Sequence, residues 1–183
     1  MFKSPGRLGL VSTDTPPAVD SDVPWLSAEQ QYEWRALFDL MATLPTAIDA
    51  QLKRDAGVNS YEYQVLVILS QSPDHTVGLS DLAEEACGSL SRLSHALTRL
   101  EKSGWVERCP DPKPGGRRMR ARLTDTGLAK IQAIAPGHVR EVRRLVIDVL
   151  TDEQLATLGD AARAITAVVQ QEVVEACREQ PDC

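Results

Sequence analysis

The stretch Ser80–Thr124 limits the possible folds of this 183-residue chain more than any other, because two short helical patterns lead directly into two strand patterns. The second helix is expected over Ser89–Ser103. Its leucines recur every three or four residues, which predicts one apolar stripe packed in a core. Gly104 follows, and a glycine there is typical of the left-handed residue that ends a helix. The leucines of the stripe are Leu90, Leu93, Leu97 and Leu100.

The opposite side of the same helix is polar and basic. Ser89, Arg92, His95 and Arg99 recur at the spacing of the leucines, and Ser91 lies next to them at the start of the helix. Guanidinium groups bind guanine or phosphate through paired hydrogen bonds, and groups at a helix N-terminus bind phosphate. The alternative is a solvated face, and for His95 contact with a base and simple exposure are equally consistent with the pattern.

A basic hairpin is predicted after this helix. Its strands are expected over Trp105–Arg108 and Met119–Leu123, and the Pro- and Gly-rich loop between them carries Lys113, Arg117 and Arg118. A helix with a basic outer face beside a basic hairpin indicates a winged helix-turn-helix that binds double-stranded DNA. In this interpretation the wing-tip arginines enter the minor groove or hold phosphate.

The distribution of charge favours nucleic acid, although the total does not. The chain carries a formal net charge of −6. Residues 89–130 hold ten lysines and arginines against four aspartates and glutamates, which gives this segment +6. A basic patch on an acidic body is the electrostatic footprint of a nucleic-acid interface. The alternative from another class, a winged module that binds a partner protein, does not need such a patch.

Long helices are predicted before and after this winged helix-turn-helix segment. A capping box at Ser27 and Gln30 begins a helix that continues to about Ala56 and is bent at Pro45. A second capping box, Asn59 with Glu62, begins a shorter helix that ends near Gln71. A short strand at Thr76–Val77–Gly78 is expected to pair with the wing, and Ser80 is expected to cap the next helix.

After the wing, Thr124 is expected to cap a helix that carries apolar residues as far as Val149 and is broken or bent at Pro136–Gly137. Thr151 and Gln154 begin the last helix, which reaches about Cys177. The apolar stripes of these helices are too wide for one small domain to bury. We therefore expect a second copy of the chain to cover them, so that an inverted-repeat DNA site meets a two-fold dimer.

These elements predict a mainly α fold with a small β wing. Residues 1–24 form a disordered arm, residues 58–124 the winged helix-turn-helix domain, and residues 25–57 and 125–178 the dimerisation helices. The polar, Pro-rich N-terminus does not resemble a signal peptide, and no apolar run is long enough to span a membrane. We therefore expect a cytoplasmic protein.

Several short motifs, in this order, resemble those of the MarR family of bacterial transcription regulators. They are Leu82–Ala83, Ser91–Arg92, Leu100–Glu101, Gly104–Trp105–Val106–Glu107–Arg108 and Leu123–Thr124–Asp125–Thr126–Gly127. The resemblance covers about Ser27–Cys177. In that family the wing usually carries Asp-x-Arg ahead of the Leu–Thr. Here Gly115 takes the position of the Asp and Arg117 keeps that of the Arg, so the usual carboxylate beside the wing-tip arginine is missing.

The resemblance implies a homodimeric repressor and a small-molecule effector that binds between the dimer helices and the DNA-binding domain. The scarce aromatic residues Trp34, Phe38, Tyr61 and Tyr63 lie in the corresponding part of the chain. Ordinary core and dimer packing is the alternative role for these four residues. A repressor that needs no ligand, with no pocket, is a further alternative.

Other classes of function find little support. No glycine-rich phosphate loop, GxSxG or HExxH motif is present, so we expect no enzyme and no cofactor. His75, His95 and His138 are scattered, which argues against a metal site. Cys87 precedes the recognition helix and Cys109 lies in the wing. A redox-sensing repressor is an alternative, but oxidant sensors of the MarR type use a cysteine near the first helix, where this chain has none, so we expect Cys87 to be a buried, unreactive thiol.

Overall fold

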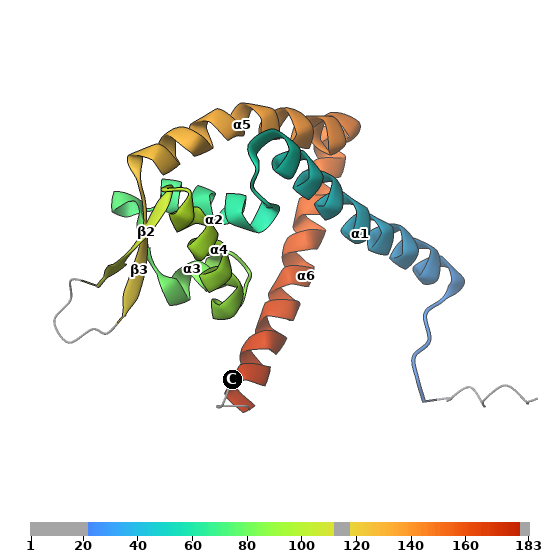
Figure 1. Cartoon of the computed structure of the whole chain (residues 1–183). Helices are drawn as coiled ribbons and strands as arrows, with labels where there is room; N and C mark the ends of the chain where they lie inside the picture. The colour runs from blue at the N-terminus through green and yellow to red at the C-terminus, as the bar shows by residue number, and fades with distance from the viewer. Residues whose placement is uncertain (1–21, 112–117, 180–183) are drawn as a thin grey trace, which may run out of the picture. The chain divides into compact units, whose positions relative to one another are not determined.

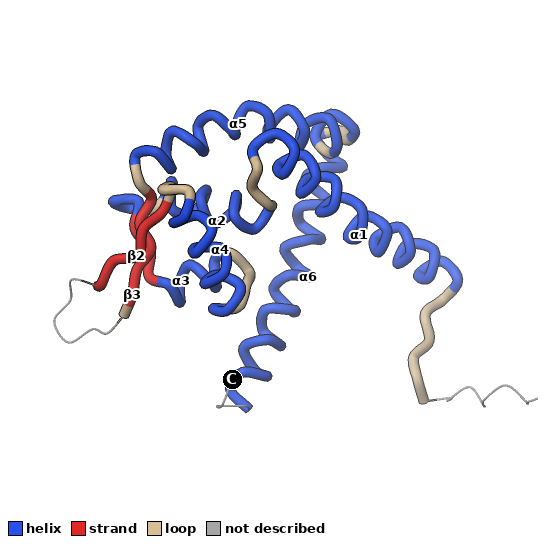
Figure 2. The backbone as a smooth tube through the Cα atoms, in the orientation of Figure 1, coloured by secondary structure: helices blue, strands red, loops and turns tan. Residues whose placement is uncertain are grey.

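The computed structural model describes residues 22–111 and 118–179, so the arm expected over residues 1–24 falls almost entirely outside it. Within these residues the chain is mainly helical, with one small antiparallel sheet (Figure 1, Figure 2). It divides into two compact units inside the first helix, between Asp39 and Leu40. The helices are α1 Ala28–Ala56, α2 Ser60–Gln71, α3 Leu79–Glu85, α4 Leu90–Lys102, α5 Asp125–Leu145 and α6 Asp152–Glu179; the strands are β1 Thr76–Gly78, β2 Val106–Pro110 and β3 Met119–Leu123; two 3-10 turns cover Pro73–His75 and Ile147–Val149.

Side-chain caps begin α1 and α2 where the sequence predicted them. The Ser27 N–H donates to Gln30 Oε1 at 2.9 Å, and the Gln30 N–H donates to Ser27 Oγ at 3.1 Å. Asn59 and Glu62 form the same reciprocal pair at the start of α2. Each box satisfies backbone donors that the first turn of a helix leaves unpaired. The expected capping boxes of α1 and α2 are therefore confirmed.

Both interior prolines are accommodated within continuous helices. α1 passes through Pro45 and α5 passes through Pro136, so α5 is not broken at that point. The path of α5 curves visibly along its length (Figure 1). The helix ends at Leu145, earlier than the apolar pattern suggested. A 3-10 turn follows, and the ion pair between Arg143 and Asp148 joins the last turn of α5 to it.

The main core of the second unit lies where α2, α3, α4 and the sheet meet. Leu66 and Leu82, on α2 and α3, are fully buried together with the α4 leucines Leu93, Leu97 and Leu100. Burying a leucine side chain contributes roughly 1.5–3 kcal/mol, so this stripe fixes the orientation of α4 on the rest of the unit. Leu90, by contrast, is 58% exposed. Its inclusion in the stripe was wrong, because the first residue of α4 lies beyond the edge of the core.

The three strands are arranged in the order β1-β3-β2. Val77 of β1 and Arg108 of β2 both lie opposite Ala121 of β3, whose small side chain is completely buried. Arg120 and Arg122 flank Ala121 and point to the other face, as alternation along a strand requires. The prediction that Thr76–Gly78 pairs with the wing is confirmed.

The base of the wing is joined tightly to the start of α5. Gly104 has φ +73°, the left-handed conformation that ends α4. The Thr124 N–H donates to the Trp105 carbonyl at 3.0 Å, and the hydroxyls of Thr124 and Thr126 both donate to the Gly104 carbonyl at 2.7 Å. Gly127 then packs directly against the Trp105 backbone.

The helix-turn-helix differs from the sequence-based expectation at two residues, Ser80 and Cys87. α3 starts at Leu79 with Gly78 as its N-cap, so Ser80 lies inside the helix and does not cap it. Cys87 has φ +50° and its side chain is exposed. The expectation of a buried thiol was wrong, because this residue forms the tight turn between α3 and α4.

No helix in the described ranges is both long and apolar enough to cross a membrane.

Candidate nucleic-acid interface

The N-terminus of α4, the recognition helix, is capped by Ser89. The Arg92 N–H donates to Ser89 Oγ at 3.2 Å. Ser91 is exposed within the first turn, as is Leu90. Of the two serines proposed from the sequence, Ser89 therefore holds the backbone, and Ser91 presents its side chain outward. The first-turn N–H groups and the Ser91 hydroxyl form a surface suited to a phosphate or a base edge.

Arg92 extends from α4 to the first turn of α2. Its guanidinium carbon lies 4.1 Å from the centre of the Tyr61 ring, which is a close cation–π contact. Tyr61 is 6% exposed, and its hydroxyl has no hydrogen-bond partner among the described residues. Burial raises the pKa of Tyr61 above its ordinary value of 10.0, while the nearby Arg92 charge opposes that rise.

Arg99 extends from α4 to α2 two helical turns further on. Its Nε lies 2.9 Å from Oε1 of Glu62, whose side chain is only 3% exposed. The other carboxylate oxygen, Oε2, accepts the Asn59 N–H at 2.9 Å and so completes the α2 capping box. Glu62 therefore serves both the start of α2 and the recognition helix.

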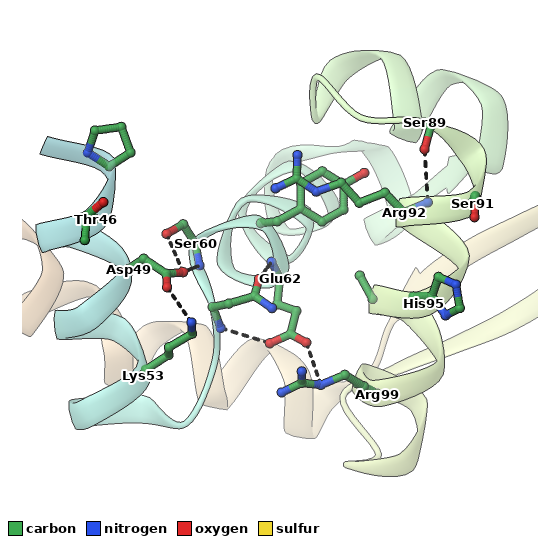
Figure 3. Close-up of a pocket in the computed structure, with 14 residues that line it drawn as sticks. Thr46, Asp49, Lys53, Ser60, Glu62, Ser89, Ser91, Arg92, His95 and Arg99 are labelled. Atoms are coloured by element: carbon green, nitrogen blue, oxygen red, sulfur yellow. Dashed lines mark hydrogen bonds and ion pairs between the residues drawn. The ribbon is translucent and has the colours of Figure 1, made fainter. Parts of the chain in front are cut away.

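These contacts form one wall of a cleft of about 850 Å³ between α4, the first turn of α2 and the second half of α1 (Figure 3). Arg92 and Arg99 extend across the cleft toward α2, whereas His95, which also borders the cleft, turns its ring away from α2 (Figure 3). The polar face predicted for α4 is thus divided between a flank turned toward α2 and an outward side. The cleft residues are Pro45, Thr46, Asp49, Lys53, Asn59, Ser60, Tyr61, Glu62, Ser89, Ser91, Arg92, His95, Ala96 and Arg99.

Asp49 of α1 anchors the opposite wall. Its Oδ1 accepts the Ser60 N–H at 2.8 Å and the Ser60 hydroxyl at 2.9 Å, and its Oδ2 pairs with Lys53 at 2.6 Å. The bond from Lys53 contributes most, and with the Ser60 bonds it lowers the pKa of Asp49 from 3.8 to about 2. Asp49 therefore stays ionised well below neutral pH, as one member of an ion pair with Lys53.

Most described arginines of the wing have partners within the protein. Arg108 pairs with Glu101 and donates through Nη2 to the Ser94 carbonyl at 2.9 Å, which ties β2 to α4. Arg120 donates to the Thr76 carbonyl at 3.1 Å, and Arg122 pairs with Glu107. Arg118 is exposed at the start of the hairpin's return strand. Lys113 and Arg117 lie outside the described residues.

Two of the four aromatic residues proposed for an effector belong to each unit. Within the second unit, Tyr61 lines the cleft, and the Tyr63 ring lies 4.6 Å from the His138 ring. Within the first unit, the Trp34 and Phe38 rings lie 6.2 Å apart and both side chains are about half exposed.

Sequence reasoning missed the acidic part of the cleft. Glu62 was recognised only as a capping residue, and Asp49 and Lys53 were not singled out at all. The i, i+4 spacing of Asp49 and Lys53 was the one available signal. The described residues contain no cluster of three or more potential metal ligands.

The fold and this face define a winged helix-turn-helix protein. A family model described as the MarR family matches residues 58–113. The crystal structure of Sco3205, a MarR family transcriptional regulator from Streptomyces coelicolor in complex with DNA, is 42% identical with a TM-score of 0.77, and the match covers 79% of this chain and 94% of Sco3205. The chain belongs to the MarR family of transcriptional regulators, as its motifs predicted.

Two further solved structures are similar. AbsC, a MarR family transcriptional regulator from Streptomyces coelicolor, is 34% identical with a TM-score of 0.76, and the match covers 81% of this chain and 99% of AbsC. NadR, solved in complex with 4-hydroxyphenylacetate, is 26% identical with a TM-score of 0.58, and the match covers 78% of this chain and 97% of NadR. No curated protein matches the chain.

Proposed function

We propose that this protein is a cytoplasmic, sequence-specific DNA-binding repressor that acts as a homodimer on an inverted-repeat operator. The observation that carries the proposal is the outward side of α4, where Ser91 and His95 are exposed beside a basic hairpin. The proposal is supported by the complex of Sco3205 with DNA, because Sco3205 is 42% identical to this chain and shares its fold. Residues 58–124 form the DNA-binding domain in this proposal.

The proposed interface has two parts. Ser91 and His95 reach base edges in the major groove, and the N-terminus of α4, capped by Ser89, faces a phosphate. Lys113, Arg117 and Arg118 of the wing hold the neighbouring backbone. Arg92 and Arg99 border the same surface, but their guanidinium groups are turned toward α2. Phosphate contacts set the affinity, and contacts with base edges set the choice of sequence.

The proposed dimer uses residues 25–57 and 125–178. On α6, Leu158, Ile165, Val168 and Val169 are exposed by 37% to 59%. On α1, Trp34, Phe38 and Met41 are exposed by about half. Long helices with exposed apolar stripes need a partner to bury them, and a second copy provides the same stripes related by a two-fold axis.

The proposed regulation is a lowering of DNA affinity by a small molecule bound in the cleft. Its volume of about 850 Å³ lies within the usual range for ligand pockets. Tyr61 borders the cleft with Arg92 of the recognition helix against its ring, so a ligand in the cleft would lie against both α2 and α4. The complex of NadR with 4-hydroxyphenylacetate supports effector binding in a relative. Such a ligand acts by favouring one separation of the two recognition helices over another.

Fluorescence anisotropy with the DNA upstream of the protein's own gene, and with a scrambled duplex, tests the proposal at two salt concentrations. We expect tight, salt-sensitive binding with a strong preference for the upstream DNA. Equal binding to both duplexes would mean that the operator lies elsewhere. Absence of binding to any duplex would reject DNA binding and favour a winged protein-interaction module.

A further inference from the structure

The first turn of α2 holds a carboxylate that is almost completely buried. The Glu62 side chain is 3% exposed, although it lies beside a helix that faces solvent. Its Oε2 accepts the Asn59 N–H, but Oε1 makes no aligned hydrogen bond and lies 2.9 Å from Arg99 Nε. Among the ion pairs of the described residues, Arg99 is the partner of Glu62.

In this arrangement Arg99 compensates the buried negative charge of Glu62. A buried charge that loses its partner is strongly unfavourable, whereas removing both partners of such a pair costs much less. Arg99 itself is 67% exposed, so solvent can serve it without Glu62. The dependence is therefore one-sided, because the first turn of α2 needs the arginine of the recognition helix.

A second contact joins the same two elements. Tyr61 precedes Glu62, and its buried ring supports the guanidinium of Arg92 at 4.1 Å. Arg92 and Arg99 are seven residues apart, which places them two turns apart on one flank of α4. Two successive residues of α2 thus contact α4 at two positions along its axis. The Arg92 and Arg99 side chains both extend to the same side of α4 (Figure 3).

We propose that the first turn of α2 positions the recognition helix, with Glu62 acting through Arg99, and that Arg99 contributes to operator binding as a positioning residue. This inference rests on the proposed DNA-binding function. Arg99 turns its guanidinium toward Glu62, and the outward side of α4 is left to residues such as Ser91 and His95. Glu62 is then a determinant of DNA affinity that does not touch DNA.

The two possible roles of Arg99 predict different effects of the Glu62→Gln substitution on DNA binding. If Arg99 contacts a phosphate, Glu62 competes for its guanidinium, and Glu62→Gln leaves binding unchanged or tighter. If Glu62 positions α4 through Arg99, Glu62→Gln weakens binding. The one amide oxygen of glutamine can still accept the Asn59 N–H and keep the capping box, while its NH2 group replaces the charged oxygen that pairs with Arg99.

The experiment compares Glu62→Gln, Arg99→Gln and the double variant with the wild-type full chain. The probe is the duplex that the wild-type protein enriches from a random-sequence DNA pool, and Kd is measured over a range of salt concentrations. Lys102→Gln is the matched control, because it removes the same charge from an exposed position of the same helix and leaves Glu62 with its partners. Urea unfolding of each variant gives a second readout.

We expect each single variant to weaken binding by at least about twofold, the smallest effect usual for residues that influence a binding site without contacting the ligand. The slope of log Kd against log salt stays at the wild-type value in Arg99→Gln, because no phosphate contact is lost. The double variant binds no more weakly than Arg99→Gln and is more resistant to urea, since it removes the unpaired buried charge.

A fall of about 0.9 in the magnitude of the salt slope for Arg99→Gln, with unchanged affinity in Glu62→Gln, would assign Arg99 to a phosphate and overturn the inference. If Glu62→Gln alone does not fold, the comparison of Arg99→Gln with the double variant decides the question, and equal urea resistance of these two refutes the inference. Failure of the wild-type protein to enrich any duplex is a different outcome: it rejects the proposed function, and the positioning role in DNA binding with it.

Discussion

Replacing Gly127 by alanine is expected to destabilise the protein, although the same substitution within a helix normally stabilises. Gly127 lies in the first turn of α5, over the base of the wing. A Cβ atom there would lie 2.7 Å from Leu123 Cδ1 and 2.9 Å from the Trp105 carbonyl carbon, and closer still to the Trp105 oxygen. That oxygen accepts the Thr124 N–H at 3.0 Å, so it cannot retreat without loss of this hydrogen bond.

The magnitude follows from two opposing effects. Alanine gains up to about 1 kcal/mol over glycine in a helix. Overpacking a tight site costs about 1–3 kcal/mol, and the upper end applies here because backbone atoms, not a flexible side chain, are in the way. We therefore expect a net loss of about 2 kcal/mol. Gly137, in the same helix, is the control, because its added Cβ would meet only Gln51 Nε2 at 3.9 Å.

Urea unfolding at a fixed protein concentration measures both variants, since the apparent stability of the proposed dimer would depend on concentration. Gly137→Ala should raise the midpoint, with a gain of about 0.5–1 kcal/mol. Gly127→Ala should lower it. If Gly127→Ala unfolds at the wild-type midpoint or above, the close approach of α5 to the Trp105 backbone is not as described, and the reasoning fails.

Three further predictions concern the wing and the α5 helix. Arg117→Ala should weaken binding to operator and random DNA together and lower the salt slope by about one unit, and an unchanged slope would reject its phosphate contact. Arg108→Met should cost about 1–3 kcal/mol in urea unfolding, because Glu101 and a backbone carbonyl lose a partly buried donor, whereas Arg122→Met at an exposed ion pair should cost less than about 1 kcal/mol. Burial lowers the pKa of His138 below its ordinary value of 6.5, so its neutral form stabilises the fold above about pH 6.5 and this contribution is lost as pH falls through the lowered pKa; His138→Asn should flatten the pH dependence of the unfolding midpoint in that range, and an unchanged profile would contradict it.

The elements of this fold could be predicted from the sequence because their signals are local. Capping residues such as Asn59 and Thr124 lie three residues from the groups they bond, and the α4 leucines repeat at helical spacing. The terminating Gly104 was recognised for the same reason. Ser80 was misassigned because it resembles a cap, while the chain begins α3 one residue earlier, from Gly78.

The candidate site was only partly predictable, because its geometry depends on contacts between distant residues. Periodicity placed Arg92 and Arg99 opposite the leucines, but it could not show that α2 lies beside that flank. Glu62 is separated from Arg99 by 37 positions, and no spacing rule joins them. Exposure of Cys87 likewise follows from a left-handed turn that its sequence neighbours do not specify.

The joint between the wing and α5 has a mechanical consequence. Thr124 and Thr126 both bond the Gly104 carbonyl, and Gly127 lies against Trp105 with no room to slide. The hinge that would let α5 rotate while the hairpin stays still is therefore missing at this point. Any tilt imposed on α5 by the proposed partner subunit is therefore transmitted directly to the sheet, and the strand ends farthest from this joint, at Pro110 and Met119, move furthest.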